Sequence, residues 1–248
     1  MITQSGPSAP VAPARVSPLA ALSAKIIRRL KQGPYDRRVL IGLRRDTAVP
    51  FAAPQAKIPI SLRPFRPDDM PNLFSETTAA TERERADIAW RLQMSAQGAL
   101  HSRCFVAVDE TTGRPCHIQW LTTGYSDVIR TAAALPVLQR DEVLLENAYT
   151  ADTYRGMGIM SAVTARIAER GAEQGARYVV AFINQHNTAS LRGGQRAGLL
   201  PWQIETQSQY AFGLVRRARF EPTPVGFVLP YEVPIGLNGQ LAQRATSG

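Results

Sequence analysis

The sequence is poor in cysteine and histidine, with 2 and 3 of these residues among 248. Both cysteines fall in one expected hairpin, where Cys104 would face Gln119 and Cys116 would face Ala107. Because the two sulfurs would not lie opposite each other, we expect reduced thiols, which are typical of a cytoplasmic protein. The histidines are scattered, with no Cys or His spacing around them, so the sequence predicts no metal site.

Long apolar runs are also missing. No run approaches the ~20 residues that a transmembrane helix needs. The first residues lack the basic and apolar regions of a secretory signal, which again favours a cytoplasmic protein. A hydrophobic content of 44% and a charged content of 20% are typical of a globular chain, and the length suits one large domain with extensions.

Acidic residues are scarce at the start of the chain. Residues 1–66 hold 12 of the 29 Lys and Arg residues but only 2 of the 20 Asp and Glu residues, so the net charge of +9 belongs to an N-terminal arm. A cap at Ser17, Pro18 at the first helical position and a stop at Gly33 predict a basic helix in this arm.

Composition divides the chain into four expected segments. These are a disordered lead (1–16), a basic arm with a helix, a short strand at 38–43 and a Pro-rich linker (17–57), a main domain (58–235) and a flexible tail (236–248).

Strands and helices alternate in the main domain, which predicts an α/β fold. The expected strands are 58–63, 104–108, 116–121, 142–150, 177–183 and one or two within 202–220. The expected helices begin at Asp68 or cover 81–97, 159–173 and 188–197, with 122–140 as a connection.

A glycine turn, Tyr154-Arg155-Gly156-Met157-Gly158-Ile159-Met160-Ser161, joins the strand at 142–150 to the helix at 159–173. Strand, glycine turn and helix form a phosphate-binding arrangement, because glycine lets a ligand approach the backbone and the start of a helix favours an anion. The turn lacks the third glycine of a dinucleotide fingerprint and the Gly-Lys-Ser/Thr of a Walker loop. It therefore predicts a phosphate-bearing cofactor of another kind.

A second pattern follows the next strand: Asn187, then Ser190 and Leu191, then Ala197-Gly198-Leu199. Together with Arg155-Gly156-Met157-Gly158, which matches Arg/Gln-x-x-Gly-x-Gly/Ala, this pattern resembles the two cofactor motifs of the GCN5-related N-acetyltransferases (GNAT family). The resemblance implies a mixed, splayed central β-sheet flanked by helices. Acyl-coenzyme A would lie in a V-shaped gap between two parallel strands, and no metal would be needed.

The resemblance also implies which residues bind acetyl-CoA or coenzyme A. Backbone amides of the turn would hold the pyrophosphate, strand backbone would pair with the pantetheine arm as an added strand does, and Asn187 would hydrogen-bond that arm. Ser190 stands where the family has a small residue facing the cofactor. The full set is Ala148, Tyr149, Thr150, Arg155, Gly156, Met157, Gly158, Ile159, Met160, Ser161, Asn187 and Ser190.

Two positions depart from the family pattern. Met160 stands where the family usually has Gly or Ala, so its side chain must point away from the phosphate. Gly194 stands where the family often has a tyrosine that protonates the departing thiolate. Tyr149, Tyr154, Tyr210 and water are the alternatives for that proton.

Glu146 is the candidate general base, because a carboxylate among apolar neighbours on the strand entering the gap is costly to bury without a role or a partner. The alternation of a strand predicts that it shares one face with Glu142, Ala148 and Thr150. An ion-paired or edge-exposed Glu146 is the alternative, and His186 is a second candidate base.

These features predict an N-acetyltransferase that moves acetyl from acetyl-CoA to a primary amine of a small molecule or peptide, by direct attack on the thioester. Transfer of a longer acyl chain from acyl-CoA or acyl carrier protein, and a non-catalytic acyl-CoA-binding module, stay open. Residues 17–45 of the arm could pack on the main domain or bind an anionic membrane surface or an acyl carrier protein. Nucleic acid is the least favoured partner, because no aromatic residues interleave with the charges. A homodimer is left open.

Overall fold

The computed structural model describes residues 35–74, 78–210 and 215–231. The expected lead, the basic helix of the arm and the tail from residue 236 lie outside the described residues, so those expectations stay predictions. The chain divides into two units, Arg38–Gln207 with Arg217–Gly248 and Met1–Arg37 with Ser208–Arg216. In the smaller unit, Tyr35 packs on Tyr210 with ring centroids 5.2 Å apart.

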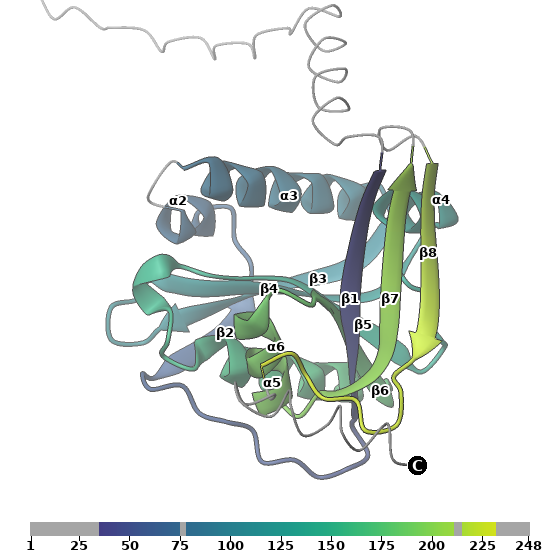
Figure 1. Cartoon of the computed structure of the whole chain (residues 1–248). Helices are drawn as coiled ribbons and strands as arrows, with labels where there is room; N and C mark the ends of the chain where they lie inside the picture. Colours follow the sequence, from purple (N-terminus) through teal and green to yellow (C-terminus); the bar gives the residue numbers. More distant parts are fainter. Residues whose placement is uncertain (1–34, 75–77, 211–214, 232–248) are drawn as a thin grey trace, which may run out of the picture. The chain divides into compact units, whose positions relative to one another are not determined.

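An eight-stranded mixed sheet runs through the fold in the order β2-β3-β4-β5-β6-β1-β7-β8 (Figure 1). Strands β5 and β6 pair in parallel, and the pairs β1/β6, β2/β3, β3/β4 and β4/β5 are antiparallel. The strands are β1 (Tyr35–Asp46), β2 (Ile60–Pro64), β3 (Leu100–Asp109), β4 (Pro115–Tyr125), β5 (Glu142–Thr150), β6 (Tyr178–Asn184), β7 (Leu200–Tyr210) and β8 (Val215–Pro222).

Strand β1 is the short strand expected at 38–43, and it pairs with β6 from Leu40, opposite Asn184, onward. Its apolar residues Ile41 and Leu43 are buried in the core. Arg44 lies between two aromatic rings of neighbouring strands, 4.4 and 4.5 Å from their centroids. The sheet therefore contains a strand from the N-terminal side of the boundary expected near residue 57, and part of the N-terminal basicity belongs to the sheet.

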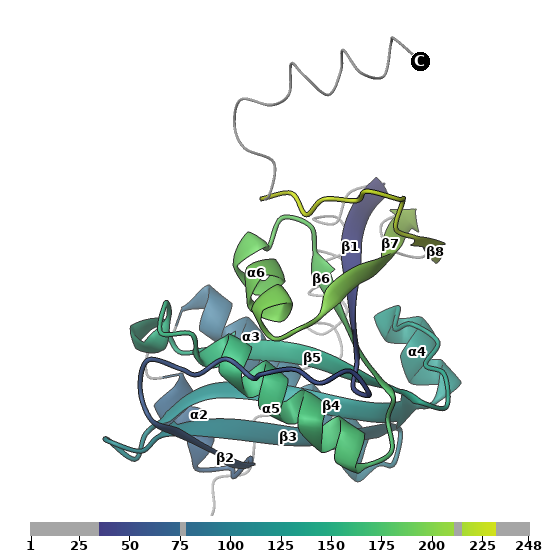
Figure 2. The same cartoon turned by 90° about the horizontal axis from the view of Figure 1, so that it is seen from below.

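Five α-helices are described, together with a 3₁₀ turn at Asp152–Tyr154: α2 (Asp69–Leu73), α3 (Ala79–Ala96), α4 (Asp127–Ala133), α5 (Ile159–Glu173) and α6 (Thr188–Arg196). Helices α2 and α3 lie on one face of strands β2 to β5, and α5 crosses the other face (Figures 1 and 2). The connection expected at 122–140 contains α4, which begins after Ser126 and ends at Ala134 in the left-handed conformation, φ 53°.

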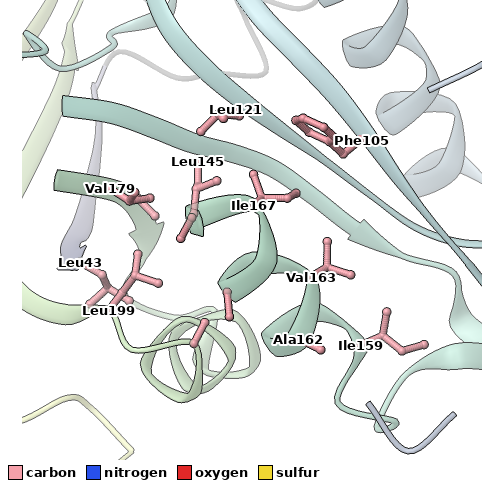
Figure 3. Close-up of a cluster of buried hydrophobic side chains, with 14 of the residues drawn as sticks. Leu43, Phe105, Leu121, Leu145, Ile159, Ala162, Val163, Ile167, Val179 and Leu199 are labelled. Carbon is pink, nitrogen blue, oxygen red and sulfur yellow. The ribbon is translucent and has the colours of Figure 1, made fainter. Parts of the chain in front are cut away.

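The main hydrophobic core joins α5 to the sheet. Figure 3 shows Ile159, Val163 and Ile167 of α5 facing Leu121 of β4 and Leu145 of β5, and all five are at most 3% exposed. Burying a side chain of this size stabilises a fold by about 1.5–3 kcal/mol. A second cluster on the opposite face packs α2 and α3 onto β4 and contains Leu73, Phe74, Ile88, Val106, Ile118 and Trp120. The strands that flank the cofactor turn are thus clamped from both sides.

The β3–β4 hairpin has the expected pairing of Val108 with Pro115, but a bulge between Ala107 and Val108 shifts the rest by one residue. Cys104 therefore lies opposite Trp120, and the expected partners Gln119 and Ala107 were wrong. The thiol of Cys116 donates to the carbonyl oxygen of Ala107 at 3.3 Å. Both cysteines are free, which confirms the expectation of reduced thiols.

Candidate functional site

The two parallel strands separate after a short paired stretch. Their pairing runs from Glu142 opposite Tyr178 to Leu144 opposite Val180. Figure 2 shows β6 leading away from β5 beyond this stretch. From Leu145 onward, the edge of β5 that faces β6 is therefore free to hydrogen-bond a ligand that lies in the gap.

A β-bulge interrupts β5 where the gap opens. Tyr149 lies opposite Ile118 and Glu146 lies opposite Trp120, so two residues of β5 stand against one of β4. One of the two, Asn147, has φ 49°, a left-handed conformation that asparagine adopts more readily than most residues. The bulge reverses the side-chain alternation along β5.

Because of this reversal, the face expected for Glu146 was partly wrong. Glu146 shares a face with Trp120 and points to the α3 side of the sheet, whereas Thr150 is on the α5 side. There the Thr150 hydroxyl is 2.7 Å from Nδ1 of the fully buried His117. Burial lowers the pKa of His117 to about 4, so this imidazole is neutral and holds Thr150 in place.

The glycine turn leads directly into α5, whose bounds agree with the expected 159–173. Gly158 is the N-cap residue at φ 74°, and no side chain caps the helix. The N–H groups of Ile159, Met160 and Ser161 consequently have no partner within the helix. Gly156 has φ 76° in open space, so glycine is favoured there by the backbone conformation and not by crowding.

A cleft of about 620 Å³, here called the phosphate cleft, lies at this helix start. The structure brings eleven of the twelve expected cofactor residues to its wall: Ala148, Tyr149, Thr150, Arg155, Gly156, Gly158, Ile159, Met160, Ser161, Asn187 and Ser190. Met157 is the exception, since its side chain packs on the core and its carbonyl oxygen accepts from the backbone N–H of Lys57 at 2.8 Å.

Charged residues of the cleft wall went unnoticed in the sequence. Arg192 and Arg196 of α6 join Arg155, so three guanidinium groups line the cleft. Arg155 is held by Asp152, at 2.6 Å, and by the carbonyl oxygen of Thr150. Glu84 of α3 is the acidic member of the wall, and burial raises the pKa of its carboxyl. The excess of cations suits a phosphate-bearing ligand.

Helix α6 completes the cleft. The Oδ1 atom of Asn187 accepts from the backbone N–H of Ser190 at 3.1 Å and so caps the helix. Its Nδ2 group is left to donate to a ligand. The thioether of Met160 lies against Gly193 of α6, because a Cβ built there would be 2.9 Å from the sulfur. A side chain held this way leaves the amide of Met160 available.

A second hollow of about 180 Å³, the inner cavity, lies between the separated strands. It shares Ala148, Met160, Asn187 and Ser190 with the phosphate cleft, so the two adjoin. Its further polar wall consists of Gln119, Glu146, Asn147, Thr164 and Asn184.

Glu146 reaches the inner cavity but is not free. Its Oε1 atom is 2.6 Å from Nη1 of Arg91 on α3 and accepts from the Thr122 hydroxyl at 2.6 Å. The side chains of Arg91 and Glu146 are 12% and 10% exposed. The ion-paired alternative is therefore what the structure contains. His186, the second candidate base, is exposed and lines none of the cavities described here.

The position of the family tyrosine is closed. A Cβ on Gly194 would be 2.8 Å from Cδ1 of Leu43 on β1 and 3.6 Å from Cδ1 of Ile183. A side chain at 194 would therefore meet the core.

None of the three candidate tyrosines lines the inner cavity. Tyr149 packs on Phe74, with ring centroids 4.7 Å apart, and Tyr154 donates to Asp109 at 3.2 Å. Tyr210 belongs to the smaller unit.

Sequence reasoning missed one buried carboxylate. Glu205 of β7 is 1% exposed, and burial raises its pKa to about 7. Its Oε1 atom accepts from Nε2 of Gln207 at 2.8 Å. Polar residues occupy both faces of β7, so its pattern carries no signal that Glu205 is buried.

Across the described ranges, no helix has the length and apolar character to cross a membrane. In the same ranges no group of three or more His, Cys, Asp or Glu residues is placed to hold a metal ion.

Several solved structures are similar to this chain. A tandem GNAT protein from the clavulanic acid biosynthesis pathway is 16% identical, with a TM-score of 0.51 over 82% of this chain and 62% of that one. A GCN5-related glucosamine N-acetyltransferase region of a fungal multi-domain GH3 β-N-acetylglucosaminidase is 15% identical, with a TM-score of 0.50 over 75% of this chain and 23% of that one. The chain thus spans less than two thirds of these proteins' length, and the likeness at this identity shows the fold.

No curated protein matches the sequence. A family model described as "Acetyltransferase (GNAT) domain" matches residues 60–200, more than half of the chain and both cofactor motifs. The chain therefore belongs to the GNAT family and contains a GNAT-type N-acetyltransferase domain.

Proposed function

We propose that this protein transfers acetyl from acetyl-CoA to a primary amine by direct attack of the amine on the thioester. The observation that carries the proposal is the continuous hollow made by the phosphate cleft and the inner cavity, which share four wall residues. A ligand with a phosphate end and a long arm fits this shape, and members of the GNAT family typically use acetyl-CoA.

The residues of the hollow suit coenzyme A. The unpaired N–H groups at the start of α5 and the guanidinium of Arg155 would bind the pyrophosphate. The free edge of β5 from Ala148 to Thr150 would hydrogen-bond the pantetheine arm, as an added strand does. Nδ2 of Asn187 would donate to the same arm, and Ser190 faces both hollows.

The chemistry needs a neutral amine, a polarised carbonyl and a proton for the thiolate. A backbone N–H near Tyr149 would polarise the carbonyl. Glu146, on the wall of the inner cavity, stays the candidate base from the sequence, although Arg91 and Thr122 already occupy its Oε1 atom. With Gly194 closed to a side chain and no candidate tyrosine on the inner wall, water is the proposed proton donor to the thiolate.

Thermal shift with coenzyme A, acetyl-CoA and octanoyl-CoA tests the donor. A narrow inner cavity predicts stabilisation by the first two and a weaker effect of the octanoyl chain. Thiol release from acetyl-CoA in the presence of a panel of primary amines tests turnover. Asn187→Ala should weaken binding, while Asn72→Ala, an exposed asparagine on α2, is the matched control. If neither coenzyme A nor acetyl-CoA stabilises the protein, the proposed function is wrong.

A non-catalytic acyl-CoA-binding module is the second candidate, favoured by the closed Gly194 position and the ion-paired Glu146. Binding of acetyl-CoA without thiol release across the amine panel, unchanged in Glu146→Gln, would support it. The roles proposed for residues 17–45, the homodimer and the cytoplasmic location stay predictions.

A further inference from the structure

A third hollow, here called the acidic cavity, lies beside the inner cavity and has a volume of about 130 Å³. Its wall includes Glu146 of β5, Glu205 and Gln207 of β7, and residues 133–136 after α4. It shares Leu145, Glu146 and Phe182 with the inner cavity but no residue with the phosphate cleft. The inner cavity therefore connects the two, with the phosphates expected at one end and the carboxylates at the other.

The two carboxylates of the acidic cavity differ in their partners. Glu146 is neutralised by Arg91. Glu205 is more deeply buried, and its partner in the described part of the chain is the amide of Gln207, which also donates to the carbonyl oxygen of Ala134 at 3.3 Å. An amide does not balance a negative charge, so ionised Glu205 is costly unless a cation enters the cavity.

Other ionisable groups surround the same cavity. Glu142 of β5 is buried, and its Oε2 atom accepts from the backbone N–H of Gln139 at 3.0 Å. Burial raises the pKa of Tyr125 on β4, and the charges of Glu146, Glu142 and Glu205 raise it further, while Arg130 lowers it. Apart from Arg91 and Arg130, the surroundings are acidic or neutral, so the cavity attracts a cation and repels an anion.

We propose that the acidic cavity binds the ammonium group of an unbranched primary alkylamine and that Glu205 removes a proton from it. The site rests on the proposed function, since the deprotonated amine then meets the thioester in the inner cavity. Leu40, Leu144 and Phe182 supply apolar wall for the alkyl chain. The small volume excludes a branched or bulky carbon next to the nitrogen.

The proton and electron balance is complete. The Glu205 carboxylate takes one proton from R–NH₃⁺, and the nitrogen lone pair attacks the thioester carbonyl carbon. The C–N bond forms and the C–S bond breaks, with the electron pair leaving on sulfur. The second proton lost by nitrogen ends on the thiolate by way of water, and Glu205 returns its own proton to solvent. Because the pKa of Glu205 is about 7, its carboxylate is poised to work near neutral pH.

The test compares Glu205→Gln, Glu205→Asp and the matched control Glu110→Gln, an exposed glutamate in the β3–β4 turn. Thiol release from acetyl-CoA is measured with n-pentylamine and with 5-aminopentanoate, and acetyl-CoA affinity is measured by calorimetry. Glu205→Gln should lower kcat/KM for n-pentylamine by about 10²–10⁴-fold, the usual contribution of a general base. Its acetyl-CoA affinity should stay unchanged.

Three further outcomes decide the proposal. The wild-type rate should fall on the acidic side of about pH 7, and this limb should vanish in Glu205→Gln and return in Glu205→Asp. The anionic 5-aminopentanoate should react at least about tenfold more slowly than n-pentylamine, the factor that about 1.4 kcal/mol of repulsion produces. Wild-type kcat/KM and an intact acidic limb in Glu205→Gln would overturn the role of Glu205. Acetyl-CoA binding without turnover of n-pentylamine would overturn the acceptor class, whereas loss of acetyl-CoA binding in the wild type would instead overturn the proposed function.

Discussion

The ion pair between Arg91 and Glu146 allows structural and chemical roles of Glu146 to be separated. Burial pushes the pKa of Arg91 down, and the charges of Glu146 and Asp87 more than offset this, so the pKa of Arg91 lies above its usual value. Removing one member of a buried pair typically costs 3–5 kcal/mol, because the other charge is left without a partner. Replacing both members by neutral groups costs much less.

The magnitudes follow from the contacts. Arg91→Met leaves Glu146 with only the Thr122 hydroxyl, so we expect a loss of about 3 kcal/mol in the free energy of unfolding. Glu146→Gln should cost about 2 kcal/mol, because Arg91 keeps Asp87 at 3.0 Å. The double variant should lose about 2–3 kcal/mol less than the sum, within the range of coupling energies between residues in contact.

Urea unfolding at pH 7.5, followed by tryptophan fluorescence, measures all four proteins, and thiol release from acetyl-CoA is measured in parallel. Arg130→Met removes the same charge from an exposed pair with Asp127 and should change stability by less than about 0.5 kcal/mol. Additive losses in the cycle would refute the argument. If the double variant regains stability without turnover, Glu146 has a role in the reaction beyond its ion pair.

Three other variants or treatments test the site. Because the pKa of Glu205 is about 7 in the folded protein against 4.5 normally, the native state holds its proton more tightly. Its contribution to stability should therefore fall by about 3 kcal/mol as the pH rises from about 4.5 to 7, and the wild-type-minus-Glu205→Gln difference in urea unfolding at pH 5 and 8 measures this. Gly158→Ala strains a residue at φ 74° by about 1–2 kcal/mol at the phosphate cleft, so calorimetry should show acetyl-CoA affinity at least about tenfold weaker, and an unchanged affinity would count against the cleft. Burial raises the pKa of Cys116 to about 11 and that of Cys104 further, so iodoacetamide at pH 8 should label neither thiol in the native protein and both in urea, as seen by mass spectrometry.

The elements around the cofactor turn could be predicted from the sequence because their signals are local. The strand at 142–150 and the helix at 159–173 have the expected bounds, set by an apolar run, a glycine turn and a 3.6-residue apolar repeat. Spacing between two such local motifs was enough to indicate the family. The cofactor wall followed, since its residues lie on the strand, the turn and the two helix starts.

The acceptor side could not be predicted, because it depends on contacts between distant segments. The bulge at Asn147 reverses the face of every later residue on β5, and only the tolerance of asparagine for positive φ hinted at it. Arg91 lies 55 positions before Glu146, and Glu205 lies on a strand with polar residues on both faces. Burial in these cases is a property of the assembled sheet and not of any stretch of sequence.

Gly194 gives the sharpest test of how this chain differs from the family pattern. Its Cβ direction leads to Leu43, which is 0% exposed on β1, so the strand that the sequence placed in the arm is what closes the tyrosine position. Overpacking costs about 1–3 kcal/mol. An alanine regains about 1 kcal/mol of helix propensity over glycine. Gly194→Ala should therefore lose up to about 2 kcal/mol in urea unfolding, and Leu43→Val should relieve most of that loss.

Gly194→Tyr should unfold at a markedly lower urea concentration and should not speed thiol release, because the ring would enter the core and not the inner cavity. A stable Gly194→Tyr protein with faster turnover would show that the position is open and that a proton donor is what this chain lacks. The opposite result would mean that β1 and the family tyrosine exclude each other, so that protonation of the thiolate in this chain has to come from water.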